Sequence, residues 1–214
     1  MKEESTLAKR SELHIMRRVW HVLCGLICMF FYYTLINDLL FWGYFALVVA
    51  LLGFFLDFQR LKKPKLNEVL SRLFGPIMRR SEKLSFSGLP FYALGCAVSI
   101  FLYQKEIAIL SIMFLIFADP MASIVGVYWG RDRLLPNKTL QGTVTAFVVC
   151  FVVSMIYMSI REIHSGDLIM FAFWGAIAGA ISELMSAFNI DDNLTIPVIS
   201  GAVLTILNFW LNIF

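Results

Sequence analysis

Long apolar runs separated by short polar segments make up most of this chain. Seven runs approach the roughly 20 residues that a helix needs to cross a bilayer. They cover residues 19–36, 41–56, 89–103, 106–129, 143–160, 168–188 and 196–214. The pattern predicts an all-α, polytopic integral membrane bundle of about seven transmembrane helices. Pro120 follows Asp119 within the fourth run, so we expect that helix to be broken there, either as one interrupted crossing or as a hairpin of two short helices.

The composition supports a membrane protein and argues against a soluble class. Of the 214 residues, 59% are hydrophobic and 15% are charged. An ordinary soluble domain is about 45–50% apolar and about 25% charged. No polar segment is long enough for a separate soluble domain, so we expect a single membrane domain over 1–214 and no nucleic-acid partner.

Basic residues are distributed unevenly between the two sides of this predicted topology. Sixteen of the 18 Lys and Arg residues lie on one side, and only Lys105 and Arg161 lie on the other. The positive-inside rule therefore predicts a cytoplasmic N-terminus and a C-terminus on the opposite side, in the cytoplasmic membrane if the protein is bacterial. A hairpin in the fourth run would move the basic residues of 130–142 across the membrane, so the charge distribution favours one crossing.

Four polar segments are expected on the cytoplasmic side. They are the N-terminal segment 1–18, the segment 57–88, and two loops that are candidates for an active site, 130–142 and 189–195. Segment 57–88 is basic and carries apolar residues at near-helical spacing, which predicts an amphipathic helix on anionic headgroups. Arg79 and Arg80, within this segment, are alternatively candidates for contact with a nucleotide or a phospholipid headgroup.

Acidic residues occur where an apolar sequence makes them costly. Asp119 lies inside the fourth run, Glu183 lies inside the sixth, and Asp191-Asp192-Asn193 lies between the sixth and seventh. A carboxylate within a span must pair, meet water or bind a cation, and carboxylate oxygens are the ligands that Mg²⁺ prefers. Asp119 could instead cap a second half-helix, and the Asp191 triplet could be a solvated turn that caps the last run.

Basic and hydroxyl-bearing residues precede the fifth run. Segment 138–143, Lys-Thr-Leu-Gln-Gly-Thr, follows Arg131 and Arg133 at a predicted helix start, where free N–H groups attract phosphate. The alternative is a basic loop with a helix cap. Arg17 and His21, at the start of the first run, are either a positive flank or contacts for a phosphate or substrate. Carboxylates for Mg²⁺ and cations for phosphate oxygens, gathered on one side, are typical of phosphoryl or nucleotidyl transfer.

The order of these motifs resembles that of the membrane-embedded CTP-dependent lipid kinases, which include diacylglycerol, polyprenol, dolichol and phytol kinases. The resemblance rests on Arg17-Arg18 with Trp20-His21 and Gly25, on Glu82, Gly88, Tyr92 and Gly95, on Asp119-Pro120 with Gly126 and Gly130, on segment 138–143, and on Glu183 and Asp191-Asp192-Asn193 with Pro197. The chain also resembles phosphatidate cytidylyltransferases more distantly. It lacks the His-Gly-Gly and Asp-Arg elements of their final motif, and this difference favours a kinase.

The resemblance and the charge inventory together lead to a hypothesis for each site residue. Mg²⁺ would be held by Asp119, Glu183, Asp191 and Asp192. The CTP donor would be bound by Arg131, Arg133, Lys138, Thr139, Gly142, Thr143 and Asn193. Catalysis of transfer to a membrane lipid alcohol would depend on Asp119, Lys138 and Asp192, with Asp119 or Asp192 accepting the hydroxyl proton. The alternatives are CDP-lipid synthesis, or a small transporter in which Asp119 and Glu183 bind a coupling cation.

Overall fold

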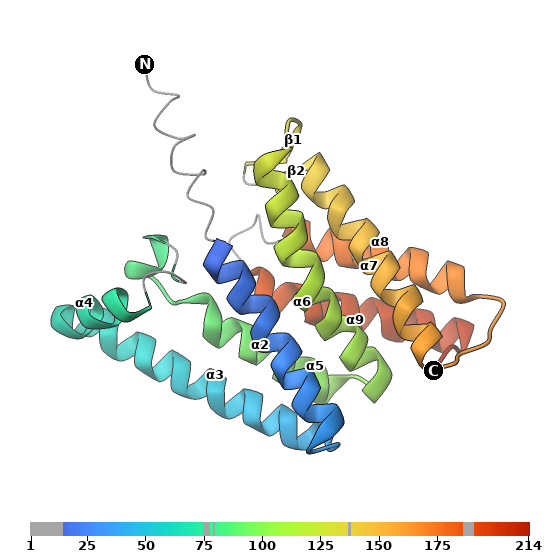
Figure 1. Ribbon diagram of the computed structural model, residues 1–214, viewed down its shortest axis with the longest axis horizontal. Helices are drawn as coiled ribbons and strands as arrows, with labels where there is room; N and C mark the ends of the chain where they lie inside the picture. Colours follow the sequence, from blue (N-terminus) through green and yellow to red (C-terminus); the bar gives the residue numbers. More distant parts are fainter. Residues whose placement is uncertain (1–14, 75–77, 79, 137, 186–190) are drawn as a thin grey trace.

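The computed structural model describes residues 15–74, 78, 80–136, 138–185 and 191–214, in an arrangement of helices with one small hairpin (Figure 1). The helices are α2 (Ile15–Thr34), α3 (Leu39–Lys62), α4 (Pro64–Leu73), the 3₁₀ helix η1 (Arg80–Lys83), α5 (Gly88–Leu102), α6 (Lys105–Tyr128), α7 (Leu140–Ile160), α8 (Leu168–Met185) and α9 (Asp192–Leu211). Strands β1 (Arg133–Leu135) and β2 (Lys138–Thr139) pair antiparallel.

The prediction of an all-α membrane bundle is confirmed. Each of the seven predicted runs corresponds to one helix, namely α2, α3 and α5 to α9. Six of these helices are long and apolar enough to cross a membrane, and α5 is a shorter apolar helix. Arg79 and the polar residues 1–14 lie outside the described residues, as does the predicted end of the sixth run at 186–188. The two-stranded hairpin in segment 130–142 was not predicted.

The predicted break at Asp119-Pro120 is wrong, because α6 continues through both residues. Pro120 removes its own N–H from the helix ladder, and its ring crowds the carbonyl group four residues earlier. It is buried in a helix that packs extensively on α7 and α9, so tertiary contacts hold the helical path. His21 of α2 also contributes here, since its Nε2 donates to the carbonyl oxygen of Leu115, in the turn before the proline, at 3.1 Å. The hairpin alternative for this run is excluded.

The alternating course of the helices gathers the predicted polar segments at one end of the bundle. The start of α2, the end of α3, the start of α5 and the end of α6 meet there, together with the β hairpin, the end of α8 and the start of α9 (Figure 1). We call this the hairpin end. The C-terminus lies at the opposite end (Figure 1). The assignment of the hairpin end to the cytoplasm stays a prediction.

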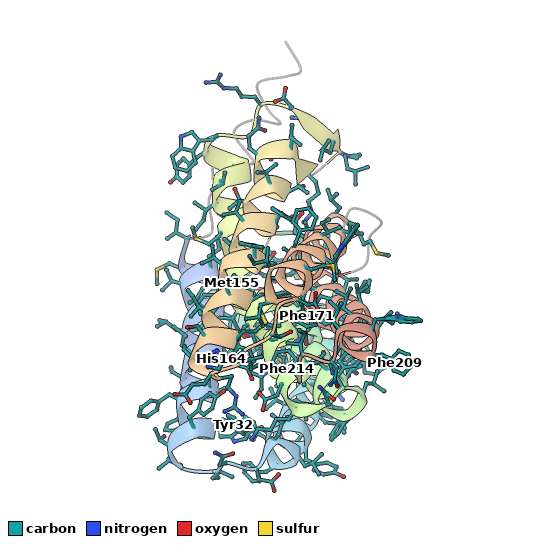
Figure 2. The ribbon with its side chains drawn as sticks, turned by 90° about the vertical axis from the view of Figure 1, so that its right-hand side faces the viewer. Tyr32, Met155, His164, Phe171, Phe209 and Phe214 are labelled. Carbon is teal, nitrogen blue, oxygen red and sulfur yellow. The ribbon has the colours of Figure 1, made fainter. Side chains whose placement is uncertain are left out.

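The interior of the bundle is formed mainly by α6 to α9. Phe114, Leu115 and Phe171 are fully buried there, and the ring of Phe171 packs edge-on against Phe214 with 5.5 Å between centroids. Figure 2 shows these two rings inside the bundle, whereas Phe209 projects from its outer surface, where 80% of the residue is exposed. Exposed aromatic side chains on a membrane helix face lipid instead of water, so this surface is compatible with a bilayer.

Candidate active site

An ion pair between Lys138 and Glu183 lies at the centre of the polar residues at the hairpin end. The Nζ of Lys138, on β2, donates to Oε1 of Glu183, on α8, at 2.5 Å. The same Nζ lies 3.9 Å from Oδ2 of Asp192, in the first turn of α9. Burial alone would lower the pKa of Lys138, but the carboxylates of Asp192, Glu183 and Asp119 outweigh it and raise that pKa above its ordinary value. Lys138 therefore remains a cation.

The β hairpin that carries Lys138 is fixed to the start of α7 by Gln141. Its Oε1 accepts from the backbone N–H of Arg131 at 3.0 Å, and its Nε2 donates to Oδ2 of Asp132 at 2.7 Å. The backbone N–H of Leu140 also donates to the carbonyl of Asp132 at 2.8 Å. These bonds satisfy groups at the helix start and set the direction in which Lys138 enters the bundle.

Small residues let the hairpin and α7 approach α6 closely. A Cβ atom added to Gly130 would lie 2.6 Å from Cγ2 of Thr139, and one added to Gly142 would lie 2.9 Å from the carbonyl oxygen of Ala122. The hydroxyl of Thr139 caps α7 by accepting from the N–H of Gly142 at 3.2 Å. Gly142 therefore serves helix packing, and its N–H donates within the cap instead of facing open space for a phosphate.

The carboxylate of Asp119 and the imidazole of His21 lie close together next to this group. Oδ2 of Asp119, on α6, lies 3.9 Å from Nδ1 of His21, on α2. The other ring nitrogen of His21 is oriented by its bond to Leu115, and the ring edge packs on Tyr92 of α5 with 4.6 Å between centroids. His21 therefore joins three helices at the carboxylate of Asp119.

Arg17 and Arg18 extend the cluster along α2. Arg17 Nη1 donates to Oε1 of Glu82 at 2.6 Å, and Glu82 is brought there by η1. A Cβ atom on Gly88 would lie 2.3 Å from Nη2 of Arg17, so the glycine leaves the space that the guanidinium occupies. Arg18 Nη2 donates to the hydroxyl of Ser123 at 2.7 Å. Both arginines thus lie inside the cluster instead of forming only a positive flank.

A buried network that was not predicted from the sequence holds the segment before α5. Arg60, a basic residue of segment 57–88, is 3% exposed and bonds Asp57 at 2.5 Å and the carbonyl of Ser85 at 2.6 Å. Oδ2 of Asp57 accepts from the N–H of Ser87 at 2.7 Å. The spacing of Asp57 and Arg60, three residues apart in a helix, was the available signal.

The structure brings some of the predicted residues together and leaves others apart. Lys138, Glu183 and Asp192 meet, with Asp119 and His21 beside them. Arg131 and Arg133 are exposed on the hairpin, and no described contact joins them to the group around Lys138. Thr143 is half-buried, and its hydroxyl has no hydrogen-bond partner among the described residues. The side chain of Arg80 is outside the described part of the chain, as is all of Arg79.

The predicted set of four Mg²⁺ ligands is not assembled in the described part of the chain. No three His, Cys, Asp or Glu side chains there are grouped closely enough to hold a metal ion. The carboxylates of Asp191, Glu183 and Asp192 have partners within the protein. Oδ1 of Asp191 caps α9 by accepting from the backbone N–H and the side-chain Nδ2 of Asn193, at 3.0 and 2.6 Å, and the ammonium of Lys138 lies between Glu183 and Asp192. The oxygen chemistry of Glu183 and Asp192 nevertheless suits Mg²⁺.

A cavity of about 210 Å³ opens beside these groups at the hairpin end. Its lining includes Arg17, His21, Glu82, Tyr92 and Asn193. Cationic, carboxylate and amide side chains thus border the same space at the ends of several helices. Such a concave site with a few convergent polar groups is typical of a small-molecule site.

Comparisons with known proteins agree with the resemblance. The cytidylyltransferase family matches residues 1–188. The chain is similar to CTP-dependent diacylglycerol kinase 1 of Schizosaccharomyces pombe, with 33% identity over 69% of this chain and 72% of the relative. It is similar to CTP-dependent diacylglycerol kinase 1 of Saccharomyces cerevisiae, with 28% identity over 87% and 71%, and to phytol kinase of Synechocystis, with 28% identity over 75% and 64%. No solved structure matches the chain.

Proposed function

The chain belongs to the cytidylyltransferase family, and from the relatives named as kinases we propose that it is a CTP-dependent lipid kinase that phosphorylates a membrane lipid alcohol. The acceptor is diacylglycerol or an isoprenoid alcohol such as phytol or a polyprenol. The observation that carries the proposal is the Lys138–Glu183 ion pair beside Asp192 and Asp119, because it places a permanent cation among carboxylates at a single site. This is the charge arrangement that phosphoryl transfer needs.

Lys138 binds the triphosphate in this proposal. Its ammonium is already located and desolvated by the contact with Glu183, so little reorganisation is needed when a phosphate arrives. As the γ-phosphoryl leaves CDP, negative charge develops on its oxygens and on the leaving oxygen, and Lys138 stabilises that charge. Arg17, which borders the cavity at the hairpin end, supplies a second cation to the nucleotide or to the phosphorylated product.

The lipid hydroxyl is the nucleophile. Its oxygen forms a bond to the γ-phosphorus, the bond from that phosphorus to the β–γ bridging oxygen breaks, and CDP leaves. We assign the hydroxyl proton to the carboxylate of Asp119. This carboxylate lies beside His21, and His21 borders the cavity. His21 acts through Asp119 by orienting it, and positioning of this kind dominates phosphoryl transfer.

Magnesium is the proposed metal cofactor, with Asp192, Glu183 and Asp119 as the residues that would hold it. Their carboxylate oxygens are hard ligands of the kind that bind Mg²⁺ beside substrate phosphates. When bound, Mg²⁺ would neutralise charge on the β- and γ-phosphates. We place the site on the cytoplasmic side, in agreement with the concentration of Lys and Arg at the hairpin end.

A matrix of donors and acceptors tests the proposal. Purified protein in liposomes is given CTP or ATP together with diacylglycerol, phytol or a polyprenol, with Mg²⁺ or with a chelator. We expect a lipid monophosphate from CTP and at least one acceptor, lost on chelation and restored by Mg²⁺. The absence of any phosphorylated lipid with either nucleotide would contradict the proposal.

CDP-lipid synthesis is the second candidate function, and the description of the matched family favours it. That reaction takes phosphatidate as acceptor and moves the α-phosphorus with the cytidine, releasing pyrophosphate. The curated relatives named as kinases favour phosphorylation instead. The two reactions differ in which phosphorus of CTP reaches the lipid, so isotope position separates them.

A further inference from the structure

A second cavity, apolar and about 280 Å³ in volume, lies between α2, α3, α5 and α6. Its walls are almost entirely hydrocarbon, aromatic rings and thiol groups. Val49 of α3, Ala93 of α5 and Ile112 of α6 are among the lining residues. Unlike the cavity at the hairpin end, it has no charged residue in its lining, so no ionic ligand is expected to enter it.

The cavity exists because two pairs of helices separate along this side of the bundle. Helix α2 packs chiefly on α6, whereas α3 packs chiefly on α5. Lining residues near the outer edge are exposed at the surface, and Phe45 of α3 is 48% exposed. Since both α2 and α3 are predicted to cross the membrane, this edge faces bilayer lipid, and a hydrocarbon chain has direct access from the membrane.

The apolar cavity adjoins the polar cavity of the candidate active site. Cys24, Leu89 and Tyr92 line both of them. The hydroxyl of Tyr92 is buried at this junction and has no hydrogen-bond partner among the described residues. A Cβ atom on Gly25 would lie 2.8 Å from that hydroxyl, so the glycine leaves room for it, and the Tyr92 ring packs edge-on against His21.

We propose that the apolar cavity binds the hydrocarbon chain of the acceptor lipid and that the Tyr92 hydroxyl hydrogen-bonds the alcohol to be phosphorylated. The inference rests on the proposed kinase function and adds the location and orientation of the lipid. A lipid alcohol has the two properties that the paired cavities match, an apolar chain and one polar terminus. Its hydroxyl would satisfy a buried Tyr92 hydroxyl whose isolation is unfavourable, and it would lie beside His21, the residue that orients Asp119.

A matched pair of substitutions on α3 tests the cavity. Val49 lines it, whereas the adjacent Val48 is 53% exposed on the outer surface. We expect Val49→Phe to raise the KM for the lipid alcohol roughly tenfold, since removing or adding even one methylene in an apolar pocket changes discrimination by about 10–200-fold. The KM for CTP should stay unchanged, and Val48→Phe should change neither constant.

A second pair tests the contact at the junction. Tyr92→Phe removes only the hydroxyl, and we expect kcat/KM for the lipid to fall about tenfold, the effect of losing one hydrogen bond, with the KM for CTP unchanged. Tyr44→Phe is the control, because Tyr44 is 62% exposed on α3 and lies outside both cavity linings.

Photolabelling supplies a readout that does not require turnover. Diacylglycerol with a diazirine near the end of one acyl chain should label peptides from α2, α3 and α5 that line the cavity, and Val49→Phe should reduce the yield while Val48→Phe leaves it unchanged. Suppose that the wild-type protein phosphorylates lipid, but the two valine variants have equal KM values for the lipid and the label lies outside these peptides. This result would overturn the cavity assignment and leave the kinase proposal in place. Protein that is labelled in the cavity but phosphorylates no lipid would support the lipid site and overturn the kinase proposal.

Discussion

The side of the bundle formed by α6 and α8 is packed more tightly than the side formed by α2 and α3. The difference corresponds to the groups that each side contains. In the most apolar stretches of α6 and α8, 61% and 50% of residues are buried, against 11% in α2 and in α3. The tightly packed side carries Asp119, Glu183 and Asp192, whereas the loosely packed side borders the apolar cavity. Buried charges need fixed partners, because a buried charge without a partner is costly. A lipid that enters from the bilayer, as proposed, needs helices that are less tightly packed.

A second comparison sets the two ends of the bundle against each other. At the end opposite the hairpin, Glu106 bonds Arg161 at 2.8 Å and also accepts from the Tyr157 hydroxyl. Arg161 is 43% exposed at its side chain, so this pair lies near the boundary of the membrane. Lys138, by contrast, is 13% exposed and is influenced by three carboxylates. Substitutions at the two ends should therefore affect different properties.

Replacing a carboxylate at the hairpin end with an amide should have the largest effect, a loss of turnover. We expect Asp119→Asn to lower kcat by about 10²–10⁴-fold, the usual contribution of a general base. Asp192→Asn should bring turnover close to background, because it removes charge beside Lys138 and a proposed Mg²⁺ ligand. Initial rates with saturating CTP and lipid measure both. Near-normal activity of either variant in folded protein would remove that carboxylate from the mechanism.

Removal of the buried cation should have the next largest effect. Lys138→Met should lower kcat by about 10²–10³-fold, as expected for loss of one preorganised group that stabilises developing charge. Lys105→Met, at the other end of the bundle, is the matched control and should retain turnover. If both lysine variants lost activity equally, the distinction between the two ends would be incorrect.

These charge contacts show why sequence predicted the components of the site better than their arrangement. Apolar runs located seven of the helices, six of them long and apolar enough to cross a membrane, because burial in lipid forces backbone hydrogen bonds to form within each segment. The meeting of Lys138 with Glu183 joins residues 45 positions apart and depends on how α7 and α8 pack. Predictions from local sequence also failed where packing between helices decides the structure. Helix α6 continues through Pro120, and Arg60 is buried in an ion pair with Asp57.

Two further residues mark the limits of prediction within the site. Arg133, expected beside the triphosphate, lies exposed on β1 with no described contact to Lys138, so its role stays a prediction. Tyr92 carried no chemical signal in an apolar helix and was named only through the family resemblance. Its position at the junction of two cavities depends on how four helices separate, which periodicity within one helix does not encode.

The packing of α5 against α9 can be tested through Gly95. A Cβ atom on Gly95 would lie 2.3 Å from the carbonyl oxygen of Asn193 and 3.2 Å from Cα of Leu194, both backbone atoms. Gly95→Ala should therefore reduce stability by about 1–3 kcal/mol, the usual effect of overpacking, and it should displace the start of α9. Thermal unfolding in detergent measures this. Gly166→Ala, where no atom lies within 4 Å, should unfold at the wild-type temperature.

The smallest effect is expected at the end opposite the hairpin. Glu106→Gln replaces a boundary ion pair with a neutral amide, so we expect a loss of roughly 0–1 kcal/mol of stability and no change in kcat. Unfolding temperature and initial rate, measured on one preparation, report both. A large loss of kcat in this variant would mean that charge at both ends takes part in turnover.

Doubly labelled CTP tests the central claim most directly. Protein in liposomes containing the preferred lipid alcohol is supplied with CTP that carries one isotope at the α-phosphorus and another at the γ-phosphorus. A lipid kinase puts the γ label into the lipid and leaves the α label in CDP, and the Lys138→Met variant should form almost no labelled lipid. The α label in the lipid, with the γ label in pyrophosphate, would contradict the account and identify cytidylyl transfer.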